Sequence, residues 1–175
     1  MALRESYCAD VACDALAAAL RQPEDQPLRL AALEALAPIR NAKSAAALAE
    51  ILRHDPSAEM RCAAADALND ALDAPAIRAL IDALRDPDAG VRLAAAISLH
   101  WTRSPEAQAA LLPLTADPNT ELAGAALAGI VRSTSPETVD VRVRATKHAD
   151  TSIVINALES LPFVYQRLPA NQRET

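Results

Sequence analysis

Histidine and cysteine are the residue types in this chain that could bind a metal ion or act as a nucleophile. A metal site needs several such side chains that converge on one point. The three histidines lie far apart in the sequence and none is followed by a glutamate; they are His54, His100 and His148. We therefore expect them to lie at the surface or to cap helices, and we predict no metal, no cofactor and no catalytic residue.

The cysteines also lack a pattern that indicates chemistry. Cys8, Cys13 and Cys62 are an odd number and include no CxxC pair. Cys8 and Cys13 are five residues apart on an expected helix, so their side chains do not meet. We expect small buried or half-buried thiols, with no disulfide framework and no zinc site. Free thiols are typical of a reducing compartment, and we predict a cytoplasmic location.

Charge and composition exclude several classes of partner. The formal net charge is −6 and the sequence pI is about 5.0, which disfavours nucleic acids and anionic lipid surfaces. The first residues lack a long apolar core, so we expect no signal peptide, and charges interrupt every apolar run too often for a membrane span. Alanine and leucine dominate the 51% hydrophobic content, while aromatic residues are 2%, a composition that favours helices.

An internal repeat organises the chain. Asp55-Pro56, Asp86-Pro87 and Asp117-Pro118 recur at a spacing of 31 residues, with His148 at the next such position. An apolar residue follows each of these four starts by thirteen residues: Leu68, Leu99, Ile130 and Leu161. Asp73, Ser104 and Ser135 have the same spacing and are typical helix caps, whose side chains accept from free backbone N–H groups. A fixed period of 20 to 50 residues is the signature of a repeat architecture.

Each repeat is expected to contain two helices and two short turns. The first helices are predicted at 5–21, 43–54, 74–85, 105–115 and 136–146, and the second helices at 27–37, 57–70, 88–101, 118–131 and 150–161. Pro113 is expected to kink its helix. We predict an all-α, right-handed α-solenoid of about five helix pairs in one domain, 1–168, with repeats at about 5–40, 41–72, 73–103, 104–134 and 135–165, and a flexible tail at 169–175.

The turn and second helix carry a recognisable motif. DPSAEMRCAAADAL and DPDAGVRLAAAISL resemble HEAT repeats, and in particular the short HEAT-like repeats of phycobilin lyases. In that family the turn aspartate and the arginine six residues later form a ladder of hydrogen bonds between successive repeats. The resemblance implies a ladder of Asp55, Arg61, Asp86 and Arg92. The pattern departs at Pro23, Ala123, His148 and Val154.

Other members of the wider family show what this chain lacks. HEAT-repeat di-iron hydroxylases carry His-Glu pairs, and none is present here. HEAT-like DNA glycosylases need a basic concave face and aromatic residues that stack on bases, whereas this chain is acidic and has one tryptophan. Most family members are scaffolds and adaptors, so the resemblance implies binding rather than a fixed reaction.

The exposed side of the second helices is the candidate binding face. A helical wheel places these residues on it: Leu30, Glu34, Cys62, Asp66, Asn69, Leu93, Ile97, His100, Gly124, Ala128, Val131, Ile155 and Glu159. We predict that the partner-binding residues are Trp101, Ile97, Leu93, His100, Asp66, Glu34 and Asn69. The apolar members would anchor the partner, and Glu34, Asp66 and Asp70 would select basic or polar groups. Alternatively, Trp101 folds down over the next turn and closes the core.

These observations leave three hypotheses about function. The first is a non-catalytic scaffold or adaptor that binds another protein or peptide, as a monomer or weak homo-oligomer. The second is an enzyme or chaperone like the phycobilin lyases, which acts on a partner apoprotein. The third is that the chain is a piece of a longer array, because Phe163 and Tyr165 are expected to be exposed on the last helix.

Overall fold

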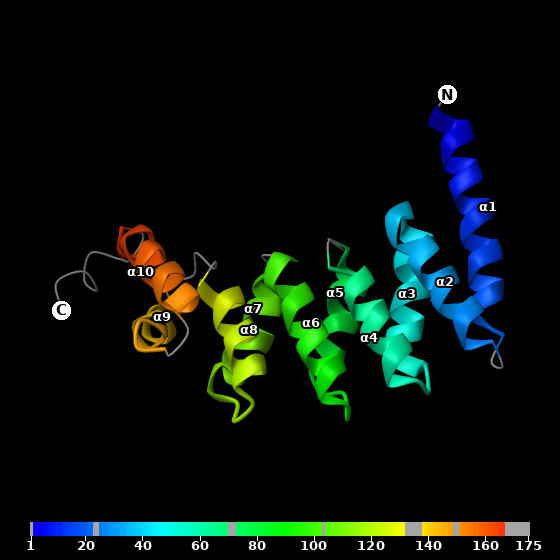
Figure 1. Cartoon of the computed structure of the whole chain (residues 1–175). Coiled ribbons are helices and arrows are strands. Elements are labelled where there is room, and N and C mark those ends of the chain that lie inside the picture. The colour runs from blue at the N-terminus through cyan, green and yellow to red at the C-terminus, as the bar shows by residue number, and fades with distance from the viewer. Residues whose placement is uncertain are drawn as a thin grey trace. The chain divides into compact units, whose positions relative to one another are not determined.

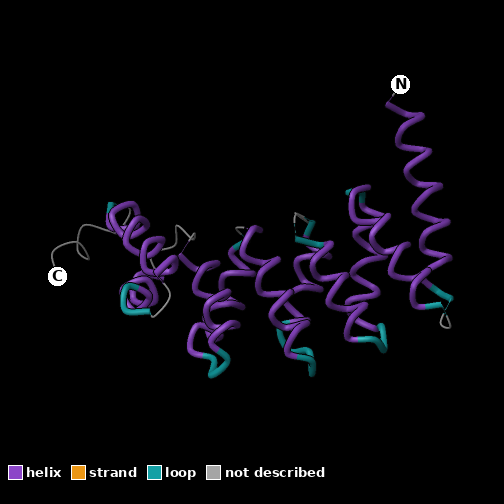
Figure 2. The backbone as a smooth tube through the Cα atoms, in the orientation of Figure 1, coloured by secondary structure: helices purple, strands orange, loops and turns teal. Residues whose placement is uncertain are grey.

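The computed structural model consists of α-helices and short connections throughout the residues that it describes, which are 2–22, 25–69, 73–102, 104–131, 138–148 and 151–166 (Figures 1 and 2). Side chains are described for these residues except at 2–8, 131, 152, 156 and 163–165. The helices are α1 (Ala2–Leu20), α2 (Gln26–Leu36), α3 (Ala42–His54), α4 (Ala58–Ala67), α5 (Ala74–Ala83), α6 (Ala89–Thr102), α7 (Pro105–Leu111), α8 (Thr120–Val131), α9 (Val139–Ala145) and α10 (Thr151–Tyr165), with 3₁₀ helices η1 (Ala37–Ile39) and η2 (Leu112–Ala116).

The all-α solenoid of helix pairs is confirmed, and the helices lie close to the predicted ranges. The second helix predicted at 88–101 is α6, Ala89–Thr102, and the first helix predicted at 43–54 is α3, Ala42–His54. At Pro113 the α-helix α7 gives way to the 3₁₀ helix η2, because proline has no N–H to donate within an α-helix. The tail predicted at 169–175 lies outside the described residues.

The chain forms two compact parts, an N-terminal part of Met1–Ser98 and a C-terminal part of Leu99–Thr175. In the N-terminal part, α1 packs on α2 and α3, and α3 packs on α4 and α5. In the C-terminal part, α8 packs on α7, η2, α9 and α10, and α9 packs on α10. Each part is thus a stack of helix pairs in which neighbouring pairs cover one another's apolar faces.

The Asp-Pro corners start the second helices by the same local chemistry in three repeats. The carboxylates of Asp55, Asp86 and Asp117 each accept the backbone N–H two residues later, at 2.9, 2.8 and 2.8 Å. The residue that donates this bond then caps the helix with its own side chain; these caps are Ser57, Asp88 and Asn119. One polar side chain therefore shapes the turn and the next starts the helix.

The predicted first-helix caps are only partly as expected. Ser104 caps α7 by accepting the N–H of Ala107. Asp73 occupies the N-cap position of α5 but makes no side-chain cap hydrogen bond. That cap prediction is wrong, and Ser135 lies outside the described residues.

The core is built from the repeated apolar positions. The series that ends the second helices is buried at Leu68, Leu99 and Ile130, with exposed fractions of 1%, 2% and 0%. The small-residue runs are also buried, including Ala64, Ala65, Ala95, Ala96 and Ala126. Small side chains let the helix backbones approach closely.

Arg142 occupies a core position that leucine holds in three earlier repeats. Leu48, Leu80 and Leu111 are 2%, 0% and 1% exposed, and Arg142, 31 residues after Leu111, is 0% exposed. Its Nη2 donates to the carbonyl of Ile130 at 3.4 Å, while Nε and Nη1 have no hydrogen-bond partner among the described residues. Burial lowers the pKa of the guanidinium. A buried, unpaired charge is costly, so this residue destabilises the repeat that contains it.

Candidate partner-binding surface

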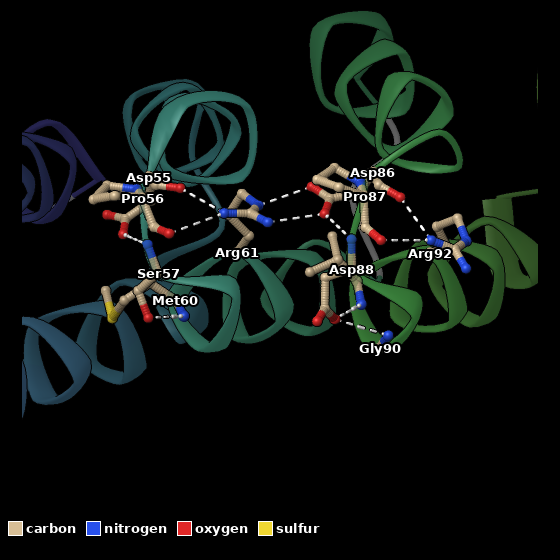
Figure 3. A network of polar contacts seen from close by, with 11 residues as sticks. Asp55, Pro56, Ser57, Met60, Arg61, Asp86, Pro87, Asp88, Gly90 and Arg92 are labelled. Carbon is tan, nitrogen blue, oxygen red and sulfur yellow. Dashed lines mark hydrogen bonds and ion pairs between the residues drawn. The ribbon is translucent and has the colours of Figure 1, made fainter.

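Arginine–aspartate pairs hold the second helices of the N-terminal part in register. Arg61 of α4 donates from Nε and Nη2 to the two carboxylate oxygens of Asp86, each at 2.8 Å (Figure 3). Its Nη1 donates to the backbone carbonyl of Asp55 at 2.8 Å. The guanidinium therefore joins its own turn to the turn of the next repeat. Because the guanidinium donates two hydrogen bonds to one carboxylate, it fixes both the distance between the two turns and their relative orientation.

A second pair of the same kind lies one repeat earlier. Arg29 of α2 forms an ion pair with Asp55, and its Nε donates to the carbonyl of Leu20 at 2.9 Å. Both residues of the pair are buried. Each ion pair therefore joins the arginine of one repeat to the aspartate of the next repeat. A second contact lies within a repeat, where the arginine six residues after the aspartate donates to the backbone carbonyl of that aspartate. Arg92 does this at Asp86, at 2.8 Å (Figure 3).

The Asp86 carboxylate gives the ladder a dependence on pH. Burial alone raises the pKa of Asp86, but hydrogen bonds from Arg61 and from the backbone N–H of Asp88 outweigh it and hold the pKa below its usual value. A lowered folded-state pKa contributes stability that is present above the unfolded pKa, about 3.9, and is lost as the pH falls through the folded pKa.

We therefore expect the Asp86→Asn variant to melt below the wild type at pH 7, with a gap that narrows as the pH falls below about 4. Melting curves from pH 7 to pH 3, followed by circular dichroism, measure this gap. A gap that stays constant over this range would contradict the assigned role of the Arg61–Asp86 pair.

The face that the ladder positions is formed by α2, α4 and α6. The Ser98 hydroxyl of α6 donates to the Ala65 carbonyl of α4 at 2.8 Å, and Gln26 of α2 donates to Glu59 of α4 at 2.6 Å. Two transverse rows of side chains result from this register. One row is half-buried and consists of Leu30, Cys62 and Leu93; the other is exposed and consists of Glu34, Asp66 and Ile97.

The two rows combine apolar surface with negative charge. Ile97 is 46% exposed. The Asp66 side chain is exposed but partly desolvated, and this desolvation raises the pKa of its carboxyl. Desolvation, followed by the negative charges of Asp66, Asp88 and Asp86, raises the pKa of the Cys62 thiol, which stays protonated at neutral pH. A protonated thiol is a poor nucleophile.

The other predicted site residues lie on both parts of the chain. Asn69 is exposed after the end of α4. Trp101 is 51% exposed and makes an edge-to-face contact with the half-buried His100, with ring centroids 4.7 Å apart. Both rings belong to the C-terminal part, where Ile155 is 49% exposed and Glu159 is exposed. Asp70 and the side chains of Cys8, Val131, Phe163 and Tyr165 lie outside the described set.

Sequence reasoning missed several polar contacts on this surface. The Arg29–Asp55 pair, the Gln26–Glu59 hydrogen bond and the caps at Ser57, Asp88 and Asn119 were not predicted. The alignment of Arg29 with Arg61 was the available signal for the first of them. Within the described ranges, no three His, Cys, Asp or Glu side chains form a group that could hold a metal ion. In the same ranges, no helix has the length and apolar character needed to cross a membrane.

The stacked helix pairs, Asp-Pro corners and arginine–aspartate rungs define an α-solenoid repeat protein. Residues 45–129 match the family model of HEAT repeats, and the predicted resemblance to HEAT-like repeats is confirmed. The sequence has no significant match among the curated proteins.

Solved structures share the fold over most of the chain. The complex of CpcE and CpcF of phycocyanin lyase from Nostoc sp. PCC7120 matches with a TM-score of 0.75 at 22% identity, over 88% of this chain and 65% of that one. Human deoxyhypusine hydroxylase in complex with glycerol matches with a TM-score of 0.63 at 28% identity, over 71% and 44%. An engineered protein matches with a TM-score of 0.66 at 20% identity, over 88% and 79%. The chain therefore spans less than two thirds of the phycocyanin lyase chain that it matches.

Proposed function

We propose that this protein is a non-catalytic scaffold or adaptor that binds a partner protein or peptide on the face of α2, α4 and α6. The observation that carries the proposal is the exposed Ile97 beside the half-buried row of Leu30, Cys62 and Leu93. Exposed apolar side chains rimmed by polar groups are typical of interaction sites. We further propose a cytoplasmic location and a monomer or weak homo-oligomer.

The surface also indicates the chemistry of the partner segment. Glu34 and Asp66 occupy on α2 and α4 the position that Ile97 occupies on α6. A segment that crosses the three helices would therefore place basic groups over the first two and an apolar side chain over the third. A basic group beside Asp66 would also compensate for the desolvation of that carboxylate.

A pull-down from the native host with the Ile97→Asp variant tests this proposal. The substitution places a charge on the apolar part of the face, and we expect retention of the partner to fall at least tenfold relative to wild type, as for a side chain at the centre of an interface. Val11→Asp is the matched control, since Val11 is 50% exposed and lies on α1, a first helix. Circular dichroism verifies that both variants fold. Equal retention by the wild type and Ile97→Asp would discard the site.

Trp101 is tested separately because it belongs to the C-terminal part of the chain. If the partner also contacts that part, the Trp101→Ala variant loses affinity while its helical content is unchanged, because the side chain is 51% exposed. Retention equal to wild type would restrict the binding surface to the N-terminal part.

A second candidate function is that of an enzyme or chaperone like the phycobilin lyases, acting on a partner apoprotein. The likeness in fold to the CpcE–CpcF complex favours it. Mixing the purified chain with a bilin provides the test, because a bound tetrapyrrole shifts its absorbance. An unshifted spectrum would argue against this candidate and leave the scaffold proposal unaffected.

A further inference from the structure

A small pocket with a cationic rim lies at the end of α9 in the C-terminal part. Its volume is about 180 Å³, and it is lined by Thr115, Leu127, Val141, Arg144, Ala145, Lys147 and His148. Among the described residues, the lining includes three basic side chains and no acidic one. The chain as a whole has a formal net charge of −6, so this group of basic side chains differs in sign from the overall charge.

The end of α9 brings the three basic side chains to one pocket. The helix ends at Ala145, and the turn that follows is closed by hydrogen bonds from the Lys147 N–H to the Arg144 carbonyl at 3.0 Å and from the His148 N–H to the Ala145 carbonyl at 3.1 Å. Arg144 and Lys147 are exposed, and neither side chain forms an ion pair or a hydrogen bond with a described residue. Their charges are therefore not neutralised within this part of the protein.

The remaining lining residues are apolar, or have a polar group that already forms a hydrogen bond within the protein. Leu127, Val141 and Ala145 are buried and apolar, and the Thr115 hydroxyl already donates to the carbonyl of Leu112 at 2.8 Å.

We propose that this pocket binds a phosphoryl group, held by Arg144 and Lys147 with His148 at its edge. A phosphoryl group presents three strong acceptor oxygens and nearly two negative charges, which suits several donors on one helix turn better than a carboxylate does. The pocket volume of about 180 Å³ accommodates a phosphoryl group. The group belongs to a phosphorylated side chain or to a free small phosphate. This site does not depend on the α2–α4–α6 face.

Calorimetric titration of the full chain with three probes tests the proposal. The probes are inorganic phosphate, a short peptide with one phosphoserine, and the same peptide with glutamate in place of phosphoserine. Binding of phosphate and phosphopeptide with equal affinity identifies a site for the free anion, and tighter binding of the phosphopeptide identifies a phosphorylated side chain. Equal binding of the glutamate peptide and the phosphopeptide, or no binding of any probe, overturns the proposal.

Matched variants test whether Arg144 and Lys147 form the site. In the Arg144→Gln/Lys147→Gln variant we expect affinity to fall roughly tenfold or more, because two charged hydrogen bonds are lost. The control is Arg78→Gln/Arg85→Gln, which removes two exposed arginines of the N-terminal part and should leave affinity within twofold of wild type. All four residues are exposed, so both variants are expected to fold. An equal loss in both variants would indicate nonspecific charge attraction and reject the pocket.

Discussion

Replacing Asp55 with alanine should lower the free energy of unfolding by about 3 to 5 kcal/mol, the usual cost of removing one partner from a buried ion pair. The carboxylate is 2% exposed, forms the ion pair with Arg29 and accepts the backbone N–H of Ser57. Its loss leaves the buried guanidinium without a counter-charge and removes the hydrogen bond that shapes the corner. Urea unfolding followed by circular dichroism measures the effect.

Two further variants distinguish an unpaired charge from a general loss of packing. In Arg29→Met/Asp55→Ala both charges are absent, so we expect this variant to be more stable than Asp55→Ala alone. Asp82→Ala is the surface control, because Asp82 is 65% exposed and lies 3.9 Å from Arg53, and its effect should stay below about 0.5 kcal/mol. If the double variant loses as much stability as Arg29→Met and Asp55→Ala lose together, the two residues are not coupled.

Replacing Arg142 with leucine should stabilise the protein, by about 1 to 4 kcal/mol if the gain resembles that for other buried charges replaced by apolar side chains. The substitution restores the residue type found at Leu48, Leu80 and Leu111, and it removes a guanidinium with two unpartnered nitrogens. A gain of this size would raise the melting temperature of a chain of 175 residues by several degrees. Calorimetry measures the change.

Arg144→Leu is the control for this prediction, because Arg144 lies two residues further along α9 and is exposed. It should change the free energy of unfolding by less than about 0.5 kcal/mol. A loss of stability in Arg142→Leu would show that the guanidinium makes contacts that stabilise the C-terminal repeat, and it would contradict the interpretation of Arg142 as an uncompensated charge.

Most of the fold could be predicted from the sequence because both the apolar and the polar positions of the repeat recur at a regular spacing. The 31-residue series of Leu68, Leu99 and Ile130 marks the core side of each second helix, and all three residues are buried. The Asp-Pro corners mark the preceding turns. Since apolar period and turn chemistry agree in each repeat, the helices could be placed to within a few residues.

The contacts between repeats were harder to predict, because they depend on distances that a single sequence does not contain. The motif relates Asp55 and Arg61, which are six residues apart, but the carboxylate pairs join Arg29 to Asp55 and Arg61 to Asp86. Likewise, a helical wheel could not decide whether Trp101 covers the core or faces solvent, and the structure leaves it 51% exposed.

Arg142 was missed for a different reason. The apolar positions define the repeat, and a charged residue at a core position interrupts that apolar series. Its distance of 31 residues from Leu111 was the available signal. Positions where a repeat breaks its own pattern are where strained or functional residues are expected.

Photo-cross-linking from position 97 tests the central claim, that the face of α2, α4 and α6 binds a partner, most directly. A benzophenone amino acid placed at position 97, and in a second variant at position 11, reports which surface touches the protein recovered in the pull-down. We predict a cross-link from position 97, identified by mass spectrometry in a basic segment of the partner, and none from position 11. Cross-linking from position 11 with none from position 97 would contradict the account.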